Sequence, residues 1–109
     1  MNSSMVDNPA VLAMRVRLTD DTVSVELSDG RTIAVPLAWY PRLVHATPKE
    51  RQSWRLIAGG RGIHWPDIDE DISVANLLAG QPSGESANSF QKWLAARAKK
   101  GRGPRRARA

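Results

Sequence analysis

Cysteine is absent from the sequence, and only two histidines, His45 and His64, occur among its 109 residues. A chain without cysteine forms no disulfide bond, has no thiol nucleophile and cannot bind zinc through thiolates. Two imidazoles are also too few for most metal centres built from histidine. We therefore expect the protein to bind no metal and no other cofactor.

Long apolar runs are absent as well. A helix that crosses a membrane needs about 20 consecutive apolar residues, and no stretch of the sequence approaches that length. Asp7 and Pro9 interrupt the segment in which a signal peptide would need its apolar region. From the sequence we expect a soluble cytoplasmic protein that makes no contact with membranes.

Acidic residues are missing from the end of the chain. The whole sequence has 16 Lys and Arg against 11 Asp and Glu, a formal net charge of +5. Residues 1–90 hold 8 of the bases and all 11 acids, a net charge of −3. The bases of residues 91–109 are Lys92, Arg97, Lys99, Lys100, Arg102, Arg105, Arg106 and Arg108. A mildly acidic domain is therefore followed by a basic tail.

Composition divides the chain into four segments. Residues 1–10 are polar and lack periodicity, which is typical of a flexible lead-in. Residues 11–80 carry the patterned apolar residues of a single domain, and the length of the chain allows one domain. Residues 81–89 have the composition of a linker. Residues 90–109 begin with helical spacing and end as a basic disordered tail.

Apolar and polar residues alternate in three runs near the N-terminus, which predicts three half-buried strands. The apolar members are Leu12, Met14, Val16 and Leu18, then Val23, Val25 and Leu27, then Ile33 and Val35. Residues opposite one another in an antiparallel pair share a face of the sheet. The register can therefore be predicted from the requirement that all apolar side chains lie on one face.

Turn length follows from the same requirement. A two-residue turn at residues 20–21 keeps the apolar side chains of the first two strands on one face, with Met14 opposite Leu27. For the next turn, a two-residue loop would divide the apolar side chains between both faces, whereas a three-residue loop at residues 28–30 keeps them together. We expect a type I turn closed by Gly30 in the left-handed conformation.

The middle of the chain predicts two short helices and a second hairpin. Apolar residues between positions 37 and 44 have helical spacing. Thr47 and Glu50 are spaced as a capping box around a proline at the first helical position. Residues 54–58 and 62–65 are predicted as two short strands joined by a glycine turn.

The segment PDIDEDISVANLLAG predicts a further helix with defined ends. Ser73 is a suitable N-cap residue and Gly80 is placed to end the helix, while Leu77 and Leu78 are expected to be buried. Four acids precede this helix, where its dipole favours negative charge: Asp67, Asp69, Glu70 and Asp71.

Residues near the C-terminus predict one more helix. Phe90, Trp93, Leu94 and Arg97 have amphipathic helical spacing, and Gly101 is expected to end the helix. Together the patterns predict an α+β fold. A small antiparallel sheet, made of the three-stranded meander and a second short hairpin, packs with two or three short helices. The amphipathic helix and the basic tail follow.

Residues 14–80 resemble a prokaryotic family, the domain of unknown function 2442. The resemblance is carried by LSDGRTIAVPLAWYPRL at residues 27–43, by the region of Trp54 and by GIHWPDIDEDISVANLLAG at residues 62–80. SGESANSFQKWLAARAKK also resembles a C-terminal extension of family members. The resemblance implies a small α+β domain without enzymatic activity. It further implies a toxin–antitoxin-like gene pair, in which the neighbouring gene encodes another small protein.

No catalytic or metal-binding motif has the spacing that its chemistry requires. Residues 67–71 open like a calcium loop, but Ile72 replaces the glycine at position six and Leu78 the glutamate at position twelve. His64 has no nucleophile or second acid placed beside it, which favours a hydrogen-bonded structural role over a general base. The glycines of residues 59–62 lack the spacing of a phosphate loop. We therefore predict a protein that is not an enzyme.

The leading hypothesis is an antitoxin-like or regulatory module that binds a small partner protein, such as the product of the adjacent gene. The domain would bind through the polar face of the meander or through the acidic turn, and the C-terminal helix would clamp the partner. The candidate contact residues are Arg15, Arg17 and Glu26 on the polar face, Asp67, Asp69, Glu70 and Asp71 in the turn, and Phe90, Trp93 and Leu94 on the helix. A basic partner would suit the net charge of the domain.

The alternative hypothesis is a nucleic-acid-binding accessory protein that acts through the eight bases of residues 91–109. Such contacts neutralise phosphates, so the affinity falls with salt and shows little sequence preference. Phe90 and Trp93 could stack on bases, but their helical spacing favours docking on the domain or on a partner. The other interpretation of these bases is a tail that only aids solubility. The third hypothesis for the protein is a metal-dependent hydrolase that uses His64 and the neighbouring acids.

Overall fold

The structure is a computed structural model that describes the backbone of residues 10–108 and the side chains of residues 10–99. Apart from Ala10, the predicted lead-in lies outside the described residues. Within the described part of the chain, six strands and six helical segments follow one another.

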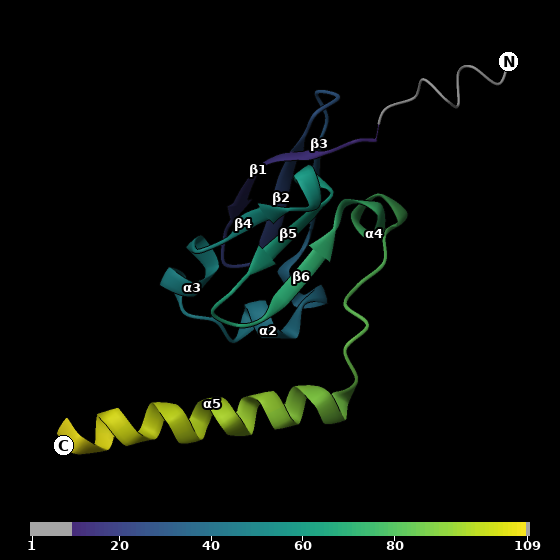
Figure 1. The fold of residues 1–109 in the computed structure, drawn as a ribbon. Helices are drawn as coiled ribbons and strands as arrows, with labels where there is room; N and C mark the ends of the chain where they lie inside the picture. Colours follow the sequence, from purple (N-terminus) through teal and green to yellow (C-terminus); the bar gives the residue numbers. More distant parts are fainter. Residues whose placement is uncertain (1–9, 109) are drawn as a thin grey trace, which may run out of the picture.

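Two three-stranded antiparallel sheets form the body of the protein (Figure 1). Sheet A has the order β1 (Ala13–Leu18), β2 (Thr22–Leu27) and β3 (Thr32–Pro36). Sheet B has the order β4 (Arg55–Ile57), β5 (Gly62–Trp65) and β6 (Glu70–Ser73). The helical segments are η1 (Leu37–Trp39), α2 (Pro41–Val44), α3 (Pro48–Gln52), η2 (Ala58–Gly60), α4 (Val74–Ala79) and α5 (Ala87–Arg108). The predicted α+β fold is confirmed.

The core lies between the two sheets and the short helices. Sheet A contributes the inward side chains of its alternating strands, and sheet B contributes Ile63, Trp65 and Ile72 to the same cluster. Trp65 is completely buried, and its indole Nε1 donates a hydrogen bond of 3.0 Å to the carbonyl oxygen of Arg51. Leu37 and Leu43 close the core from the side of η1 and α2.

Most of the predicted register of sheet A is confirmed. Val25 lies opposite Ile33, and Arg15 lies opposite Glu26 on the outer face. The second turn has the predicted three-residue loop, in which Gly30 has a φ of 93° and donates to the carbonyl oxygen of Leu27 at 3.0 Å.

The predicted pairing of Met14 with Leu27 is wrong. A β-bulge between Ala13 and Arg15 places Ala13 opposite Leu27, so Ala13 is buried and Met14 is 59% exposed. The turn after β4 approaches β1 so closely here that a Cβ on Gly60 would lie 3.2 Å from the carbonyl oxygen of Ala13. The small alanine fits beneath this turn, and the bulge directs the longer methionine to solvent.

The predicted helix ends in the middle of the chain are confirmed. At α3, Thr47 accepts from the backbone of Glu50 and the Glu50 carboxylate accepts from the backbone of Thr47. At α4, Ser73 is the N-cap and Gly80 ends the helix with a φ of 70°. The predicted burial of Leu78 is wrong, and its side chain is exposed. Helix α4 has only six residues and covers the core with a narrow stripe of its surface.

Strand β6 is the element that the sequence did not predict. Residues 70–73 were expected to precede a helix, but they pair with β5, so that Trp65 lies opposite Glu70 and His64 opposite Asp71. The strand contains Glu70 at an inward position, where an apolar residue is usual. This inward charge removes the alternation by which such a strand is recognised.

Helix α5 is longer than predicted at both ends. It begins at Ala87, after the Ser86 hydroxyl has accepted a hydrogen bond of 3.0 Å from the backbone of Ser89. It continues through Gly101 to Arg108, where the sequence predicted a disordered tail. A glycine ends a helix when it adopts the left-handed conformation, as Gly80 does, but otherwise it only lowers helix stability by about 1 kcal/mol.

Candidate functional site

Helix α5 lies beneath the body, next to α2, and the extended segment of residues 81–86 connects it to α4 (Figure 1). Arg42 of α2 fixes this connection. Its Nε and Nη2 donate to the carboxylate of Glu85 at distances of 2.6 to 3.1 Å, and its Nη1 donates to the carbonyl oxygen of Ile68 at 2.9 Å. The bonds from Arg42 hold the pKa of Glu85 below its usual range.

Two guanidinium groups flank Trp93 of α5. The Cζ atoms of Arg42 and Arg97 lie 5.1 and 4.9 Å from the ring centroid of Trp93, which is a favourable cation–π distance. Phe90 stacks on Trp93 at 5.8 Å, and its edge meets the ring of His45 at 5.3 Å. The aromatic face of α5 is thus directed toward the body.

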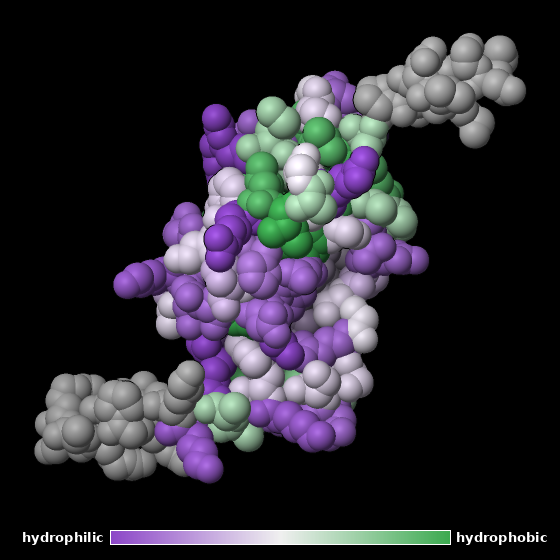
Figure 2. Space-filling view, in the orientation of Figure 1, coloured by the Kyte–Doolittle hydropathy of each residue, from purple (hydrophilic) through white to green (hydrophobic). Residues whose placement is uncertain are grey.

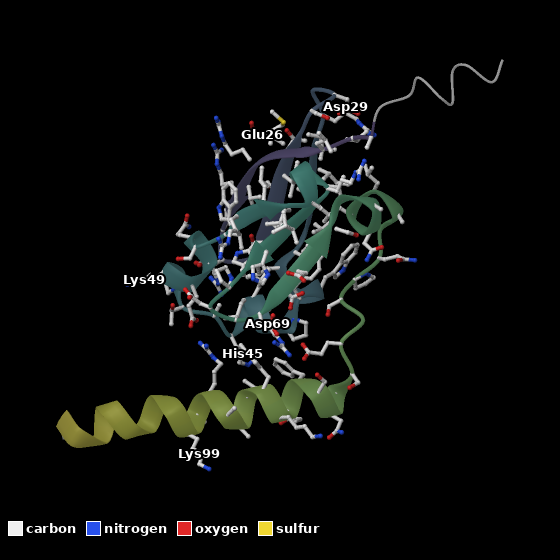
Figure 3. All side chains as sticks on the ribbon, in the orientation of Figure 1. Glu26, Asp29, His45, Lys49, Asp69 and Lys99 are labelled. Atoms are coloured by element: carbon white, nitrogen blue, oxygen red, sulfur yellow. The ribbon has the colours of Figure 1, made fainter. Side chains whose placement is uncertain are left out.

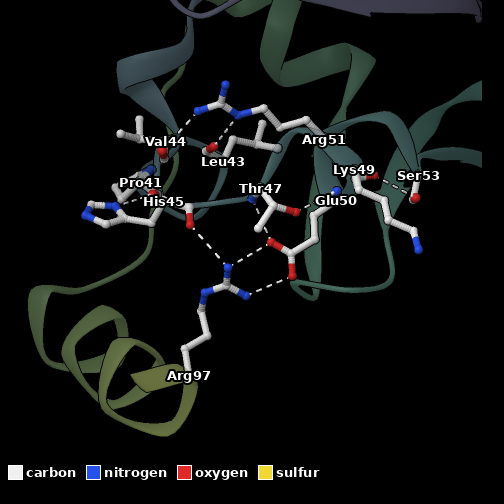
Figure 4. Close-up of polar contacts among 10 residues, drawn as sticks. All are labelled: Pro41, Leu43, Val44, His45, Thr47, Lys49, Glu50, Arg51, Ser53 and Arg97. Carbon is white, nitrogen blue, oxygen red and sulfur yellow. Dashed lines mark hydrogen bonds and ion pairs between the residues drawn. The ribbon is translucent and has the colours of Figure 1, made fainter. Parts of the chain in front are cut away.

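Arg97 forms the second anchor of α5 (Figure 4). It donates to both carboxylate oxygens of Glu50 at 2.8 and 3.0 Å and to the carbonyl oxygen of His45 at 3.2 Å. The hydrogen bonds from Arg97 lower the pKa of Glu50, which also caps α3 through Thr47. One carboxylate therefore connects the end of α3 to α5.

Glu70 of β6 and Tyr40, two residues before Arg42, are both buried polar residues. Glu70 is 8% exposed, and burial raises its pKa to about 7, with the charges of Glu85, Asp71 and Asp69 adding to the effect and Arg42 opposing it. Burial and the charge of Glu70 raise the pKa of Tyr40 to about 12. Within the described residues the Tyr40 hydroxyl has no hydrogen-bond partner.

An open cleft of about 530 Å³ separates the first turns of α5 from the body. Its lining residues are Arg42, Asp69, Ser86, Asn88, Ser89, Lys92 and Trp93. The lower part of the molecular surface, next to α5, is largely hydrophilic, whereas apolar residues gather higher on the same face (Figure 2). The cleft thus offers charges of both signs, amide and hydroxyl groups, and one aromatic ring.

The structure brings some predicted contact residues together and separates others. Asp69 and Trp93 both line the cleft, and Phe90 lies directly beside Trp93. Leu94 is half-buried on α5. Glu26 of the polar face of sheet A lies at the opposite end of the body from Asp69 (Figure 3). On that face, exposed Arg15 and Glu26 form an ion pair of 3.9 Å, and Arg17 is exposed.

The predicted acidic turn is not a continuous exposed surface. Asp67 and Asp69 are exposed, but Glu70 is buried, because its strand position points toward the core. Asp71 pairs with Nδ1 of His64 at 2.5 Å across β5 and β6. This contact confirms the predicted hydrogen-bonded role of His64.

The basic residues of α5 have two different surroundings. Arg97 is engaged with Glu50, whereas Lys92 and Lys99 are exposed, and Lys92 lines the cleft. The side chains of Lys100, Arg102, Arg105, Arg106 and Arg108 lie outside the described residues. Among side chains 10–99, no three His, Asp or Glu residues are grouped so that they could hold a metal ion.

Sequence reasoning did not identify Arg42, Tyr40 or Glu85 as site residues. Arg42 and Glu85 are 43 positions apart, and neither lies in a motif of known chemistry. Tyr40 was expected only as part of an apolar helical stripe. The position of Glu85 could have indicated a role, because it lies two residues before α5, where the helix dipole favours negative charge.

Two packed sheets, short capped helices and a docked C-terminal helix define a small α+β domain with a helical arm. The chain belongs to the family described as Protein of unknown function (DUF2442), which matches residues 13–83. The expected resemblance is confirmed. Within residues 10–108, none of the helices combines the length and the apolar character needed to cross a bilayer.

Two solved structures are similar to this chain. A protein of unknown function from Rhodospirillum rubrum has a TM-score of 0.62 and 26% identity, over 71% of this chain and 95% of that one. An uncharacterised protein from Chromobacterium violaceum has a TM-score of 0.60 and 20% identity, over 88% of this chain and 84% of that one. No curated protein matches the sequence.

Proposed function

We propose that the protein is a non-enzymatic interaction module, antitoxin-like or regulatory, that binds a segment of a small partner protein in the cleft between α5 and the body. The observation that carries this proposal is the cleft itself, which is about 530 Å³ in volume and open to solvent. Asp69 from the body and Lys92 from α5 line it with opposite charges. A polar peptide segment with charged side chains fits such a lining.

Trp93 gives the cleft an anchor for the partner. Its ring lines the cleft while Arg42 and Arg97 hold it in place. An aromatic ring fixed by its neighbours loses little conformational entropy when a partner packs against it. The partner is expected to be the product of the adjacent gene, as in the gene pairs implied by the family resemblance.

The test is titration of that gene product into the purified protein by calorimetry. Lys92→Glu reverses a charge in the cleft, and we expect it to weaken binding by about tenfold or more. Lys99→Glu makes the same change of charge on the exposed surface of the same helix, outside the cleft, and is expected to leave the affinity nearly unchanged. Equal effects of both variants, or no binding to the wild-type protein, would contradict the proposal.

A second candidate function is binding of nucleic acid by the far end of α5. The helix continues to Arg108, and no acid occurs in its 22 residues. A continuous basic helix of that length, about 33 Å, can follow a phosphate backbone.

Truncation after Ala98 tests this candidate while keeping Trp93 and Arg97 in place. It removes six bases, so the slope of log affinity against log salt for duplex DNA should become shallower by up to about 5. The full-length protein is expected to lose affinity steeply with salt. The candidate is wrong if both forms bind with the same affinity and the same slope.

A further inference from the structure

Arg42 bonds to the carboxylate of Glu85 and to the backbone next to Glu70, which belong to different parts of the molecule. Its Nε and Nη2 donate to Glu85, in the segment that leads into α5. Its Nη1 also donates to the carbonyl oxygens of Ile68 and Asp69, at 2.9 and 3.3 Å, which places the guanidinium next to the backbone that carries Glu70. The hydrogen bonds of the Arg42 guanidinium go to Glu85, Ile68 and Asp69, and none goes to the Glu70 carboxyl group.

We propose that Arg42 exchanges between these carboxyl groups, binding Glu85 when α5 is docked and ionised Glu70 when α5 is released, so that a proton on Glu70 controls the docking of the helix. The exchange takes place within the isolated chain and does not depend on which partner the protein binds. It requires movement of the Arg42 guanidinium, of the connecting segment and of α5, whose contacts through Trp93 and Arg97 break on release, while the two sheets stay as they are.

The charged and titratable groups that act on Glu70 come from α2 and the residue before it, from the two neighbours of Glu70 in the chain and from the connecting segment. They are Arg42 on α2, Tyr40 just before α2, Asp69 and Asp71 on either side of Glu70, and Glu85 in the connecting segment. In the docked state burial is the main cause of the raised pKa of Glu70; Arg42, which is bonded to Glu85, opposes it in part, and the charges of Glu85, Asp71 and Asp69 add to it. Release of α5 removes Glu85 and leaves Arg42 to pair with Glu70, which lowers the pKa of Glu70 toward its ordinary range.

The sign of the pH effect follows from linkage. The docked state has the higher pKa for Glu70, about 7, and therefore binds the proton more tightly. Docking is strongest at low pH and weakens as the pH rises from about 4.5 to about 7, with no further change above that. Each pKa unit between the two states changes the docking equilibrium up to about tenfold.

The other anchors of α5 stay charged within this window. The pKa values of Glu85 and Glu50 are both lowered by their arginine partners, so both ion pairs persist at pH 5. His45 is a further titratable residue in contact with α5, since its ring centroid lies 5.3 Å from that of Phe90. His45→Gln is therefore a necessary control.

The absence of cysteine makes the exchange directly measurable in the full chain. Spin labels on Lys49→Cys of α3 and Lys99→Cys of α5, both at exposed positions, report the distance between body and helix. We expect one narrow distance distribution at pH 5 and a second population at pH 7.5 that grows about tenfold or more relative to the first. Glu70→Gln should keep the narrow distribution at every pH, and His45→Gln should respond like the wild type.

A carbon-detected NMR titration of Glu70 in the wild type and in Glu85→Gln provides a second test without a change at Glu70. With Arg42 released from Glu85, the pKa of Glu70 should fall by one unit or more. A wild-type distance distribution that does not change with pH would overturn the proposal. The same holds if Glu70→Gln keeps the pH response, or if Glu85→Gln leaves the pKa of Glu70 unchanged. Partner titration is a separate measurement, so failure of the proposed function and failure of this inference are distinguishable.

Discussion

Replacement of Trp65 by alanine is expected to lower the free energy of unfolding by about 4 kcal/mol. Trp65 is completely buried between the sheets, so alanine would leave a large cavity that the two sheets cannot close without distortion. The substitution also leaves the carbonyl oxygen of Arg51 without its donor. Small domains have total stabilities of about 5–15 kcal/mol, so this variant should be close to unfolded, as measured by urea denaturation and circular dichroism.

Trp54→Ala is the matched control for this prediction. Trp54 is only half-buried at the edge of the core, and its removal leaves a site that water can fill. We expect a cost of about 1–2 kcal/mol. Equal costs for the two tryptophans would mean that Trp65 is not the centre of the core.

Replacement of Arg42 by alanine is expected to lower the free energy of unfolding by about 3 kcal/mol and to release α5. The side chains of Arg42 and Glu85 are only 15% and 11% exposed. Loss of the guanidinium therefore leaves a largely buried carboxylate and two carbonyl oxygens without their donor. The loss of helix docking should appear as increased mobility of residues 87–99 in NMR relaxation.

Two variants separate this effect from a general loss of positive charge. Arg17→Ala removes an exposed arginine from sheet A and should cost less than about 0.5 kcal/mol. Arg42→Lys keeps the charge but loses the paired bonds that a guanidinium forms with a carboxylate, so it should lie between wild type and alanine. A fully docked α5 in Arg42→Ala would show that Trp93 and Arg97 suffice to hold the helix.

The sheet register was predictable wherever local chemistry determined it. The parity of apolar side chains and the glycine at position 30 fixed both turns of the meander, because a shift of one residue would have exposed one strand's apolar face. The bulge at Met14 was not predictable. It depends on the close approach of a turn that follows β4, more than 40 residues later in the chain.

The inward position of Glu70 could not be predicted from the sequence, because the residue is charged. Pattern recognition assigns acids to the surface, and three further acids beside Glu70 strengthened the interpretation as the start of a helix. The strand became visible only through its pairing with β5. Glu70, which interrupts the apolar alternation of β6, is also the residue whose protonation we propose to control the docking of α5.

The candidate site was predictable in part. Amphipathic spacing correctly placed Phe90 and Trp93 on one face of a helix. Asp69 was selected because it is one of four neighbouring acids. The cleft that Trp93 and Asp69 share depends on ion pairs between distant positions, Arg42 with Glu85 and Arg97 with Glu50. No periodicity in a single sequence reports such pairs, because each partner lies in a different element.

Site-specific photo-crosslinking tests the central claim, that α5 and the body bind a partner between them, most directly. A crosslinking amino acid replaces Asn88, which lines the cleft, or Arg17, which is exposed on the outer face of sheet A and does not line the cleft. With the adjacent gene product present, the cleft position is predicted to give one covalent complex of the combined mass and the sheet position none. Crosslinking from Arg17 alone, or equally from both positions, would contradict the claim.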